Sequence, residues 1–204
     1  RDEIRDFIVD MEYGGMPPRP EIVKVQQVDY FPRQERWFRI TAGSAARQLT
    51  FYLEINIPSK NGNAMAPLEE GERYPVLLTG DGCWRNMDTD SINEILRRGY
   101  IAARFNRLEI AADQPEREGG IYDIYPENKE FSAISAWAWG YMTVMDALEQ
   151  LPFVDINEVG IAGHSRGGKT ALLAGTMDDR IKYVCPNNSG CHGVTTYRTE
   201  VFEQ

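Results

Sequence analysis

The chain has 204 residues, enough for one domain of ordinary size or for most of a larger one. It carries 22 Lys and Arg against 31 Asp and Glu, a formal charge of -9, and shows no basic cluster. This balance argues against nucleic acid and anionic membranes as partners. The longest uncharged run, 131–145, has 15 residues, whereas a membrane-spanning helix needs about 20. We therefore expect a folded soluble protein without a membrane span.

Cysteine usage excludes two further classes. Cys83, Cys185 and Cys191 are too few and too scattered for a disulfide scaffold or a zinc site. Cys185 and Cys191 can pair, but nothing in the sequence requires it. We expect neither a metal nor an organic cofactor. The chain begins at Arg1 without a signal-peptide pattern, so the compartment cannot be read directly from it.

The beginning of the chain predicts a strap along the surface of a domain. A short charged amphipathic segment is followed by 14–20, a run of glycines and prolines that cannot form regular structure. We divide the chain into this N-terminal strap, 1–35, and one main domain, 36–204. In the domain, 36–40 and 50–57 alternate apolar and polar residues, which predicts antiparallel strands with one wet face.

The pattern changes after a loop at 60–71. A short apolar run, 76–79, predicts a buried parallel strand that ends at Gly80-Asp81-Gly82. Asp90 is expected to cap a helix over 91–98, which Gly99 ends. Residues 100–105 predict the next buried strand, and 106–130 a long acidic loop of the kind that is often functional.

Strands and helices alternate in the last part. Apolar residues at spacings of three and four predict a long helix from 131 to about 150. A strand over 159–162, an Ala- and Leu-rich helix over 168–176 and a strand over 182–185 follow. This order predicts an α/β fold, a three-layer sandwich with helices on both faces of a mostly parallel central sheet and antiparallel N-terminal strands. Six strands are expected in all.

The sharpest signal is Gly-x-Ser-x-Gly within 159–169, between an apolar strand and a small-residue helix. In this context Ser165 is expected to sit on a strained turn that pushes a nucleophile out at the end of the sheet. Gly163 and Gly167 are needed there because neighbouring backbone passes close on both sides. The amide after the serine lies at a helix N-terminus, where the dipole favours an oxyanion.

The same residues also fit a phosphate-binding loop. Gly163, four residues, then Gly168-Lys169-Thr170 match the Walker A pattern. A nucleotide-binding fold would place that loop after its first strand, but about three parallel strands precede it here. The charge of -9 and a second oxyanion-type loop at 80–83 also favour a hydrolase.

A nucleophilic serine needs a base and an acid that orients the base. Of the two histidines, His164 is expected to point away into the packing of the sheet or helix, as a structural residue. His192 can reach the site as an alternative base. Only 39 residues follow Ser165, too few for the remaining strands and for a histidine in the usual chain order. We therefore expect an α/β-hydrolase domain truncated after its sixth strand, with the acid and histidine beyond Gln204.

The segment 163–169, with 178–180 and 187–191, resembles the glucuronoyl esterases, carbohydrate esterase family fifteen, especially bacterial members. The similarity extends over 74–193. It implies an α/β-hydrolase that cleaves glucuronate esters in plant cell wall xylan and its lignin cross-links. It also implies that Ser165 is the nucleophile, that Arg166 helps to hold the oxyanion and that Lys169 contacts sugar hydroxyls.

The residues themselves agree with these roles but leave other readings open. The Arg166 guanidinium can supply donors to an oxyanion or form a surface ion pair. Lys169, one helical turn past the serine, can meet a sugar or only solvent. Two sites depart from the family: Asn188 stands where fungal members have a glutamate, and His192 is unusual in its glycine-rich pattern.

Three functions follow as alternatives. The first is a secreted or periplasmic serine esterase acting on a carbohydrate ester of glucuronoxylan or of lignin-carbohydrate cross-links. The second is an acetyl xylan or other carbohydrate esterase of the same fold. The third is a catalytically incomplete carbohydrate-binding relative. Trp84, Trp137 and Trp139 can stack on sugars, although helical spacing favours Trp137 in the core. The sequence does not define an oligomeric state.

Overall fold

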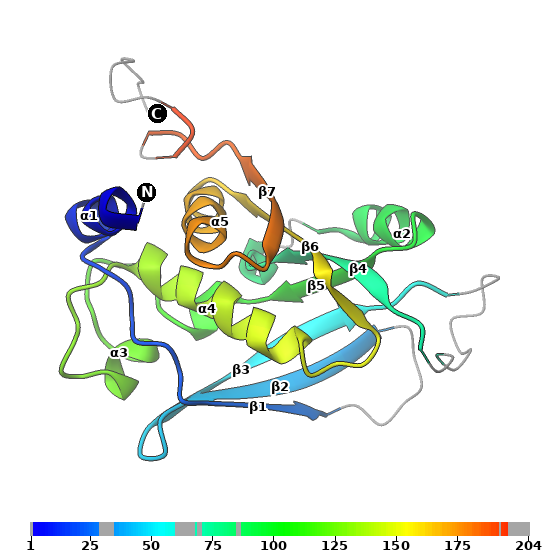
Figure 1. Cartoon of the computed structure of the whole chain (residues 1–204), viewed down its shortest axis with the longest axis horizontal. Coiled ribbons are helices and arrows are strands. Elements are labelled where there is room, and N and C mark those ends of the chain that lie inside the picture. Colours follow the sequence, from blue (N-terminus) through cyan, green and yellow to red (C-terminus); the bar gives the residue numbers. More distant parts are fainter. Residues whose placement is uncertain are drawn as a thin grey trace.

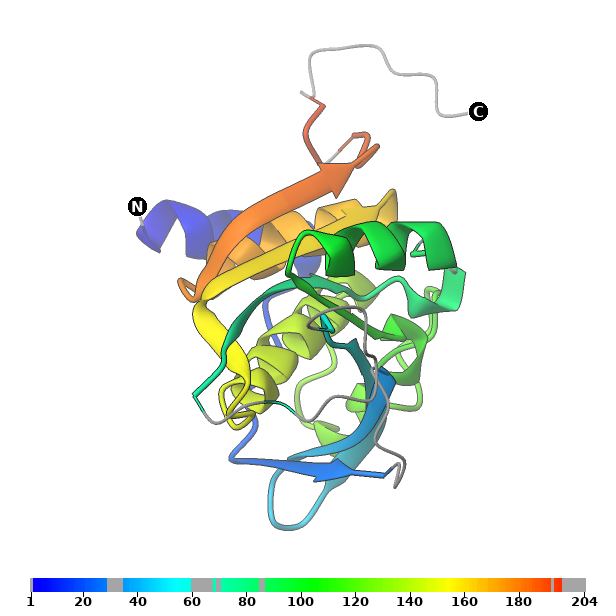
Figure 2. The same ribbon diagram turned by 90° about the vertical axis from the view of Figure 1, so that its right-hand side faces the viewer.

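The structure, a computed structural model, describes residues 2–28, 35–59, 68, 71–84, 87–191 and 193–195. Its described strands form one seven-stranded sheet in the order β1-β2-β3-β5-β4-β6-β7. Figure 1 shows α4 and α5 together on one face of this sheet, and Figures 1 and 2 show α2 on the opposite face. The predicted α/β class, with helices on both faces, is confirmed.

The first three strands are antiparallel. β1 (Ile22–Gln27) pairs with β2 (Glu35–Gly43), which pairs with β3 (Gln48–Asn56). In β2 and β3 buried and exposed residues alternate over much of the strand, as the sequence predicted. β1 is a seventh strand that the prediction of six missed. It lies within 1–35, so the part of the chain that we treat as a strap also contributes a strand to the sheet.

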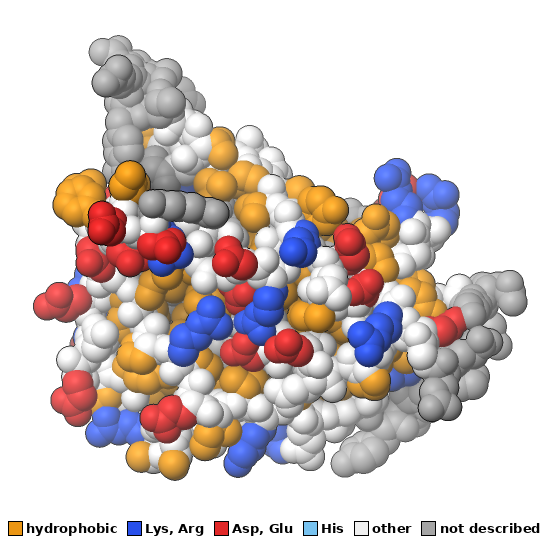
Figure 3. All heavy atoms as spheres, in the orientation of Figure 1, with side chains coloured by type: hydrophobic (Ala, Val, Ile, Leu, Met, Phe, Trp, Pro, Cys, Tyr) orange, Lys and Arg blue, Asp and Glu red, His pale blue; other side chains and the backbone are white. Residues whose placement is uncertain are grey.

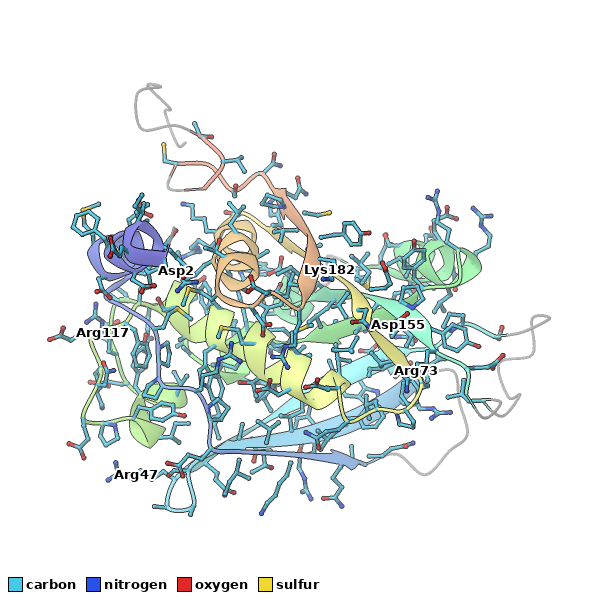
Figure 4. All side chains as sticks on the ribbon, viewed as in Figure 1. Asp2, Arg47, Arg73, Arg117, Asp155 and Lys182 are labelled. Atoms are coloured by element: carbon cyan, nitrogen blue, oxygen red, sulfur yellow. The ribbon has the colours of Figure 1, made fainter. Side chains whose placement is uncertain are left out.

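The parallel part follows. β3 is antiparallel to β5 (Ile101–Phe105), and β5 is parallel to β4 (Tyr74–Thr79). β4 in turn is parallel to β6 (Val154–His164), and β6 to β7 (Ile181–Asn187). The carboxyl ends of β4, β6 and β7 therefore lie at the same edge of the sheet. Figure 4 labels Asp155 and Lys182, which mark the opposite, amino ends of β6 and β7.

One helix start differs from the prediction. α2 (Thr89–Arg97) is capped by Asp88, whose side chain accepts a hydrogen bond from the Ser91 amide at 2.8 Å. The predicted cap, Asp90, lies in the first turn instead. Two acidic residues, two positions apart, compete for this role, and the sequence pattern does not separate them.

The two helices on the other face differ in burial. α5 (Arg166–Met177) buries one side, whereas α4 (Ala133–Leu148) is buried almost all round. The reason is the N-terminal segment, where α1 (Asp2–Tyr13) leads into the irregular residues 14–20. Trp139 Nε1 donates to the Pro18 carbonyl at 2.9 Å, and the Ser132 amide donates to the Tyr13 carbonyl at 2.7 Å. The segment thus covers the outer side of α4.

The tryptophans of α4 belong to the core. Trp137 is 0% exposed and Trp139 is 1% exposed. Neither is available for stacking on a sugar, so that expectation was wrong for Trp139, while the core placement of Trp137 is confirmed. Trp84, 58% exposed, remains accessible in the short 3-10 turn Gly82–Trp84.

The predicted acidic loop at 106–130 contains two short helical segments, a 3-10 turn at Arg107–Glu109 and α3 (Ile121–Ile124). No helix in the described part of the chain is long and apolar enough to cross a membrane. On the face in Figure 3, Lys and Arg side chains alternate with Asp and Glu, and the described residues form no basic patch there.

Candidate active site

Ser165 lies at the turn between the end of β6 and the start of α5. Its backbone has φ 54° and ψ -119°, a left-handed conformation that costs a non-glycine residue about 1–3 kcal/mol. Its amide donates to the Asn187 carbonyl at 2.9 Å, and its own carbonyl accepts from the Lys169 amide at 3.1 Å. These bonds tie the turn to β7 and to the helix. The exposed side chain sits at the carboxyl edge of the sheet, as expected for a nucleophile elbow.

Both glycines of the motif are required by close contacts. A Cβ on residue 163 would overlap the carbonyl of Gly167. A Cβ on Gly167 would overlap the carboxylate of Asp81 and the guanidinium of Arg107. The first contact is with backbone, as the sequence predicted, whereas the second is with a pair of charged side chains that the sequence did not reveal.

Asp81 and Arg107 form a buried ion pair directly beneath the elbow. They are 1% and 3% exposed, respectively. The second carboxylate oxygen of Asp81 accepts from the His164 amide at 2.7 Å, so the pair holds the last residue before the serine. The guanidinium also lies over the Trp137 ring, 4.7 Å from its centroid. Burial lowers the pKa of Arg107 from its ordinary value.

Tyr141 fixes the two neighbouring loops relative to each other. Its hydroxyl accepts from the Gly80 amide at 2.6 Å and donates to the Ala162 carbonyl at 2.8 Å. It thereby joins the loop after β4 to the strand that carries the elbow. Burial raises the pKa of Tyr141 to about 12, so the hydroxyl stays protonated and keeps its donor at neutral pH.

Arg166 and Lys169 lie on the first turn of α5. The Arg166 side chain is 54% exposed, and its guanidinium forms an ion pair with Asp113 at 2.6 Å. Asp113 belongs to the long acidic loop, so the structure connects that loop to the elbow. Lys169 is partly buried one turn past the serine. The structure therefore brings Ser165, Arg166 and Lys169 together at one edge of the sheet.

The expectation for His164 was wrong. Its side chain is exposed rather than packed into the sheet or helix. It lines a cavity of about 370 Å³ between α2 and the carboxyl ends of β4, β6 and β7. His164 is still paired with Asn187 in the sheet, and strand alternation places its side chain on the same face as Ala162, which lines the same cavity. His192, the alternative base, lies outside the described residues.

The cavity beside the elbow has polar and apolar sides. Its polar lining comes from the strand ends and from the first turn of α2, and its apolar lining from α2 and β4. The lining residues are Leu77, Thr79, Asp81, Met87, Ser91, Ile95, Ala162, Gly163, His164 and Asn187. A cavity of this size at the carboxyl ends of parallel strands is a usual place for a small ligand in an α/β protein.

The position of the glycine-rich turn in the sheet argues against a phosphate-binding loop. Three parallel strands, β4, β5 and β6, precede the turn in the chain, as expected. The turn therefore does not follow the first strand. The left-handed conformation of Ser165 is that of an elbow, and no such strain is needed to cradle a phosphate.

No group of three or more metal-ligating side chains occurs in the described ranges. This finding covers only the described residues, so the expectation that the reaction needs no metal stays a prediction. All three cysteines are free, so Cys185 and Cys191 do not pair in this structure. Burial raises the pKa of the Cys83 thiol, which lies in the turn after β4.

Sequence reasoning placed Asp81 in the oxyanion-type loop at 80–83 but missed its ion pair with Arg107, and it missed Arg107 and Tyr141 as parts of the site. Each had a weak local signal: Asp81 stands between two glycines after a buried strand, and Arg107 follows the next strand by two residues. Their pairing depends on β4 and β5 being neighbours in the sheet, which neither segment encodes alone. The sequence indicates only that Tyr141 lies on the apolar face of the long helix, and nothing in it points to a role in the site.

A strained serine between a parallel strand and a helix, in a sheet with antiparallel strands first, defines an α/β-hydrolase. A family model described as "Glucuronyl esterase, fungi" matches residues 40–204. The chain belongs to the glucuronoyl esterase family. The resemblance seen in the sequence is thus confirmed, while the likeness to bacterial members in particular stays a prediction.

Individual relatives support this assignment. The chain is 41% identical over 205 residues to a "4-O-methyl-glucuronoyl methylesterase 1" of Phanerochaete chrysosporium, covering 97% of this chain and 39% of that protein. It is 28% identical to a "4-O-methyl-glucuronoyl methylesterase" of Phanerochaete carnosa, covering 100% and 47%. A glucuronoyl esterase structure from Caldicellulosiruptor kristjansonii matches with TM-score 0.76 and 26% identity, over 97% of this chain and 52% of that one. The chain thus spans about half the length of its relatives.

Proposed function

We propose that the chain carries the nucleophile of a serine carboxyl-ester hydrolase that acts on glucuronate esters of plant cell wall carbohydrates. The observation that carries this proposal is the exposed Ser165 at φ 54° between β6 and α5. The names of the relatives, methylesterases of 4-O-methyl-glucuronoyl groups, supply the substrate class.

The proposed reaction has two steps. The Ser165 hydroxyl attacks the ester carbonyl, and the alcohol leaves with the proton that a base takes from the serine. Water then attacks the acyl-enzyme and releases the uronic acid. The amide of Arg166 at the helix N-terminus and its guanidinium stabilise the oxyanion in both steps. Lys169, one turn further on, donates to sugar hydroxyls.

A base and an orienting acid are still required. The described residues include one histidine, His164, and it lines the cavity. Because His164 directly precedes Ser165 in the chain, we do not assign it as the base. We therefore keep the expectation that the histidine and acid belong to a longer chain. A polymeric wall substrate lies outside the cell, so we also propose a secreted or periplasmic protein.

Fluorophosphonate labelling followed by intact-mass measurement tests the nucleophile. We expect a mass gain in the longest natural chain that contains residues 1–204, and none in its Ser165→Ala variant. Equal labelling of both proteins, or no labelling of either, would contradict the assignment of Ser165.

The substrate class requires a second assay. The same chain should hydrolyse the methyl ester of 4-O-methyl-glucuronic acid and leave acetylated xylan largely intact. The reverse preference would favour the acetyl esterase alternative. Binding of glucuronoxylan without hydrolysis of either ester would favour the catalytically incomplete relative.

A further inference from the structure

Asp113 is the residue of the long acidic loop that contacts the elbow helix. Its carboxylate lies 2.6 Å from the guanidinium of Arg166, the residue that follows Ser165 in the chain. The two side chains differ in exposure: Asp113 is 20% exposed and Arg166 is 54% exposed. The less exposed acid is the fixed member of the pair, and the long arginine is the member that needs fixing.

The backbone that carries Asp113 is anchored in the core. Two residues earlier, the Ala111 carbonyl accepts from Trp137 Nε1 at 2.9 Å, and the Ile110 carbonyl accepts from the Ile121 amide at 2.9 Å. Ile110 and Ala111 are 0% and 2% exposed. The loop at this point is thus part of the packed structure, so the carboxylate is presented from a rigid support.

Two groups near the elbow respond to the charge of Asp113. Its charge raises the pKa of Cys83, in the turn that follows β4, in addition to the larger effect of burial. At Arg107 the Asp113 charge raises the pKa and the Arg166 charge lowers it, both less than burial does. Besides its ion pair with Arg166, Asp113 therefore interacts electrostatically with the turn after β4 and with Arg107. This turn and the first amide of α5 are the two places from which an elbow receives its oxyanion donors.

We propose that Asp113 is a positioning residue, whose carboxylate holds the Arg166 guanidinium on the side of Ser165 where the ester oxyanion forms. This inference rests on the proposed esterase function. A guanidinium carries five N–H donors, so one can bind Asp113 while others face the oxyanion. A free arginine would lose side-chain entropy each time it took up this position.

A double-mutant cycle tests the proposal, with two substrates: p-nitrophenyl acetate, a small activated ester that needs no sugar contacts, and the methyl ester of 4-O-methyl-glucuronic acid. In the longest natural chain containing residues 1–204, Asp113→Ala should lower kcat about tenfold, a fraction of the loss that follows removal of an oxyanion donor. KM should change by less than about twofold. In an Arg166→Ala background, the same substitution should have less than about a twofold effect, because its target is gone.

Asp123→Ala is the matched control. Asp123 is an exposed acid of the same loop, and the described residues give it no ion pair. The kcat of the Asp123→Ala variant should equal that of the wild-type chain. Asp113→Asn, which keeps an acceptor oxygen without the charge, should fall between wild type and Asp113→Ala. An unchanged kcat in Asp113→Ala, or an equal loss with and without Arg166, would overturn the proposal.

The contact can also be observed without turnover. In an ¹⁵N NMR spectrum of the chain, the Arg166 guanidinium signals should shift and broaden in Asp113→Ala and stay in place in Asp123→Ala. Failure of the glucuronate assay with retained p-nitrophenyl acetate hydrolysis would overturn the proposed substrate and leave the cycle valid. No hydrolysis of either ester by the wild-type chain would overturn both.

Discussion

Two aspartate–arginine pairs flank the same serine turn, and they differ in almost every respect except their chemistry. Asp81–Arg107 lies beneath the turn, 1% and 3% exposed, with further contacts to a backbone amide and an indole ring. Asp113–Arg166 lies above it, with the arginine 54% exposed. Removing charges from water is costly, so a buried pair is stable only as a complete unit, whereas an exposed pair is worth little energy. We infer that Asp81–Arg107 holds the turn in place and that Asp113 orients the Arg166 guanidinium.

The largest effect should follow from breaking the buried pair. Arg107→Met leaves the Asp81 carboxylate without its cation in the core. We expect the free energy of unfolding to fall by about 3–5 kcal/mol, measured by urea denaturation. A loss below about 1 kcal/mol would show that the pair does not support the fold.

Its control is the double variant Asp81→Asn with Arg107→Met. Asparagine still offers an oxygen to the His164 amide, and neither position then carries a charge. Replacing a whole buried pair is often close to neutral, so most of the lost stability should return. If the double variant is less stable than Arg107→Met alone, the ion pair is not acting as a unit.

Tyr141 provides the next effect, because it links the loops that the buried pair supports. Tyr141→Phe removes a hydroxyl that binds the Gly80 amide and the Ala162 carbonyl. Leaving buried backbone groups without partners should cost about 1–3 kcal/mol at pH 7, again by urea denaturation. Tyr183→Phe, at an exposed tyrosine of β7, is the control and should change little.

The pH dependence of stability tests the same residue. Burial raises the pKa of Tyr141 to about 12, above the value near 10 of an unfolded chain. The contribution of Tyr141 to the free energy of unfolding is therefore complete below pH 10. It is lost as pH rises from 10 to 12, because the unfolded state releases the tyrosine proton first. Tyr141→Phe should lose less stability over this window. Tyr13, whose pKa is also raised to about 12, mainly by burial, is replaced by Phe in both proteins. Equal slopes would contradict the assignment.

Strain at the serine predicts a gain rather than a loss. Ser165→Gly removes the Cβ that makes φ 54° unfavourable, while glycine costs about 0.5–1 kcal/mol of additional unfolded-chain entropy. We expect a net stabilisation of about 1 kcal/mol by urea denaturation. Ser165→Ala keeps the Cβ and should match the wild type. A destabilised glycine variant would mean that the turn is not strained.

These effects separate what the sequence predicts from what only the fold reveals. Gly163, Ser165 and Gly167 were predictable because an elbow is encoded in consecutive residues, and the close contact at residue 163 confirms the reason for a glycine. The α/β order followed from the apolar patterns of each strand. β1 was missed because its exposure is mixed along the strand and its edge position leaves it without a continuous apolar run.

The charged pairs could not be predicted for a different reason. Asp81 meets Arg107 because β4 and β5 are adjacent, and Asp113 meets Arg166 because the long acidic loop reaches the first turn of α5. Both contacts join residues distant in the chain through the order of strands. Similarly, His164 looked like a packed residue from its place in the motif, although the strand ends there and the side chain reaches the cavity.

The smallest effect on stability should come from the exposed pair. Asp113→Asn should change the free energy of unfolding by less than about 1 kcal/mol, because solvent screens the charges and the arginine gives up side-chain entropy to form the pair. Urea denaturation beside Arg107→Met measures both pairs on one scale. A loss of about 3 kcal/mol or more at Asp113 would make this pair a structural element like the buried one. A small loss, together with a lower kcat, would mean that the two pairs divide their work: the buried pair maintains the turn, and the exposed pair orients the guanidinium that the reaction uses.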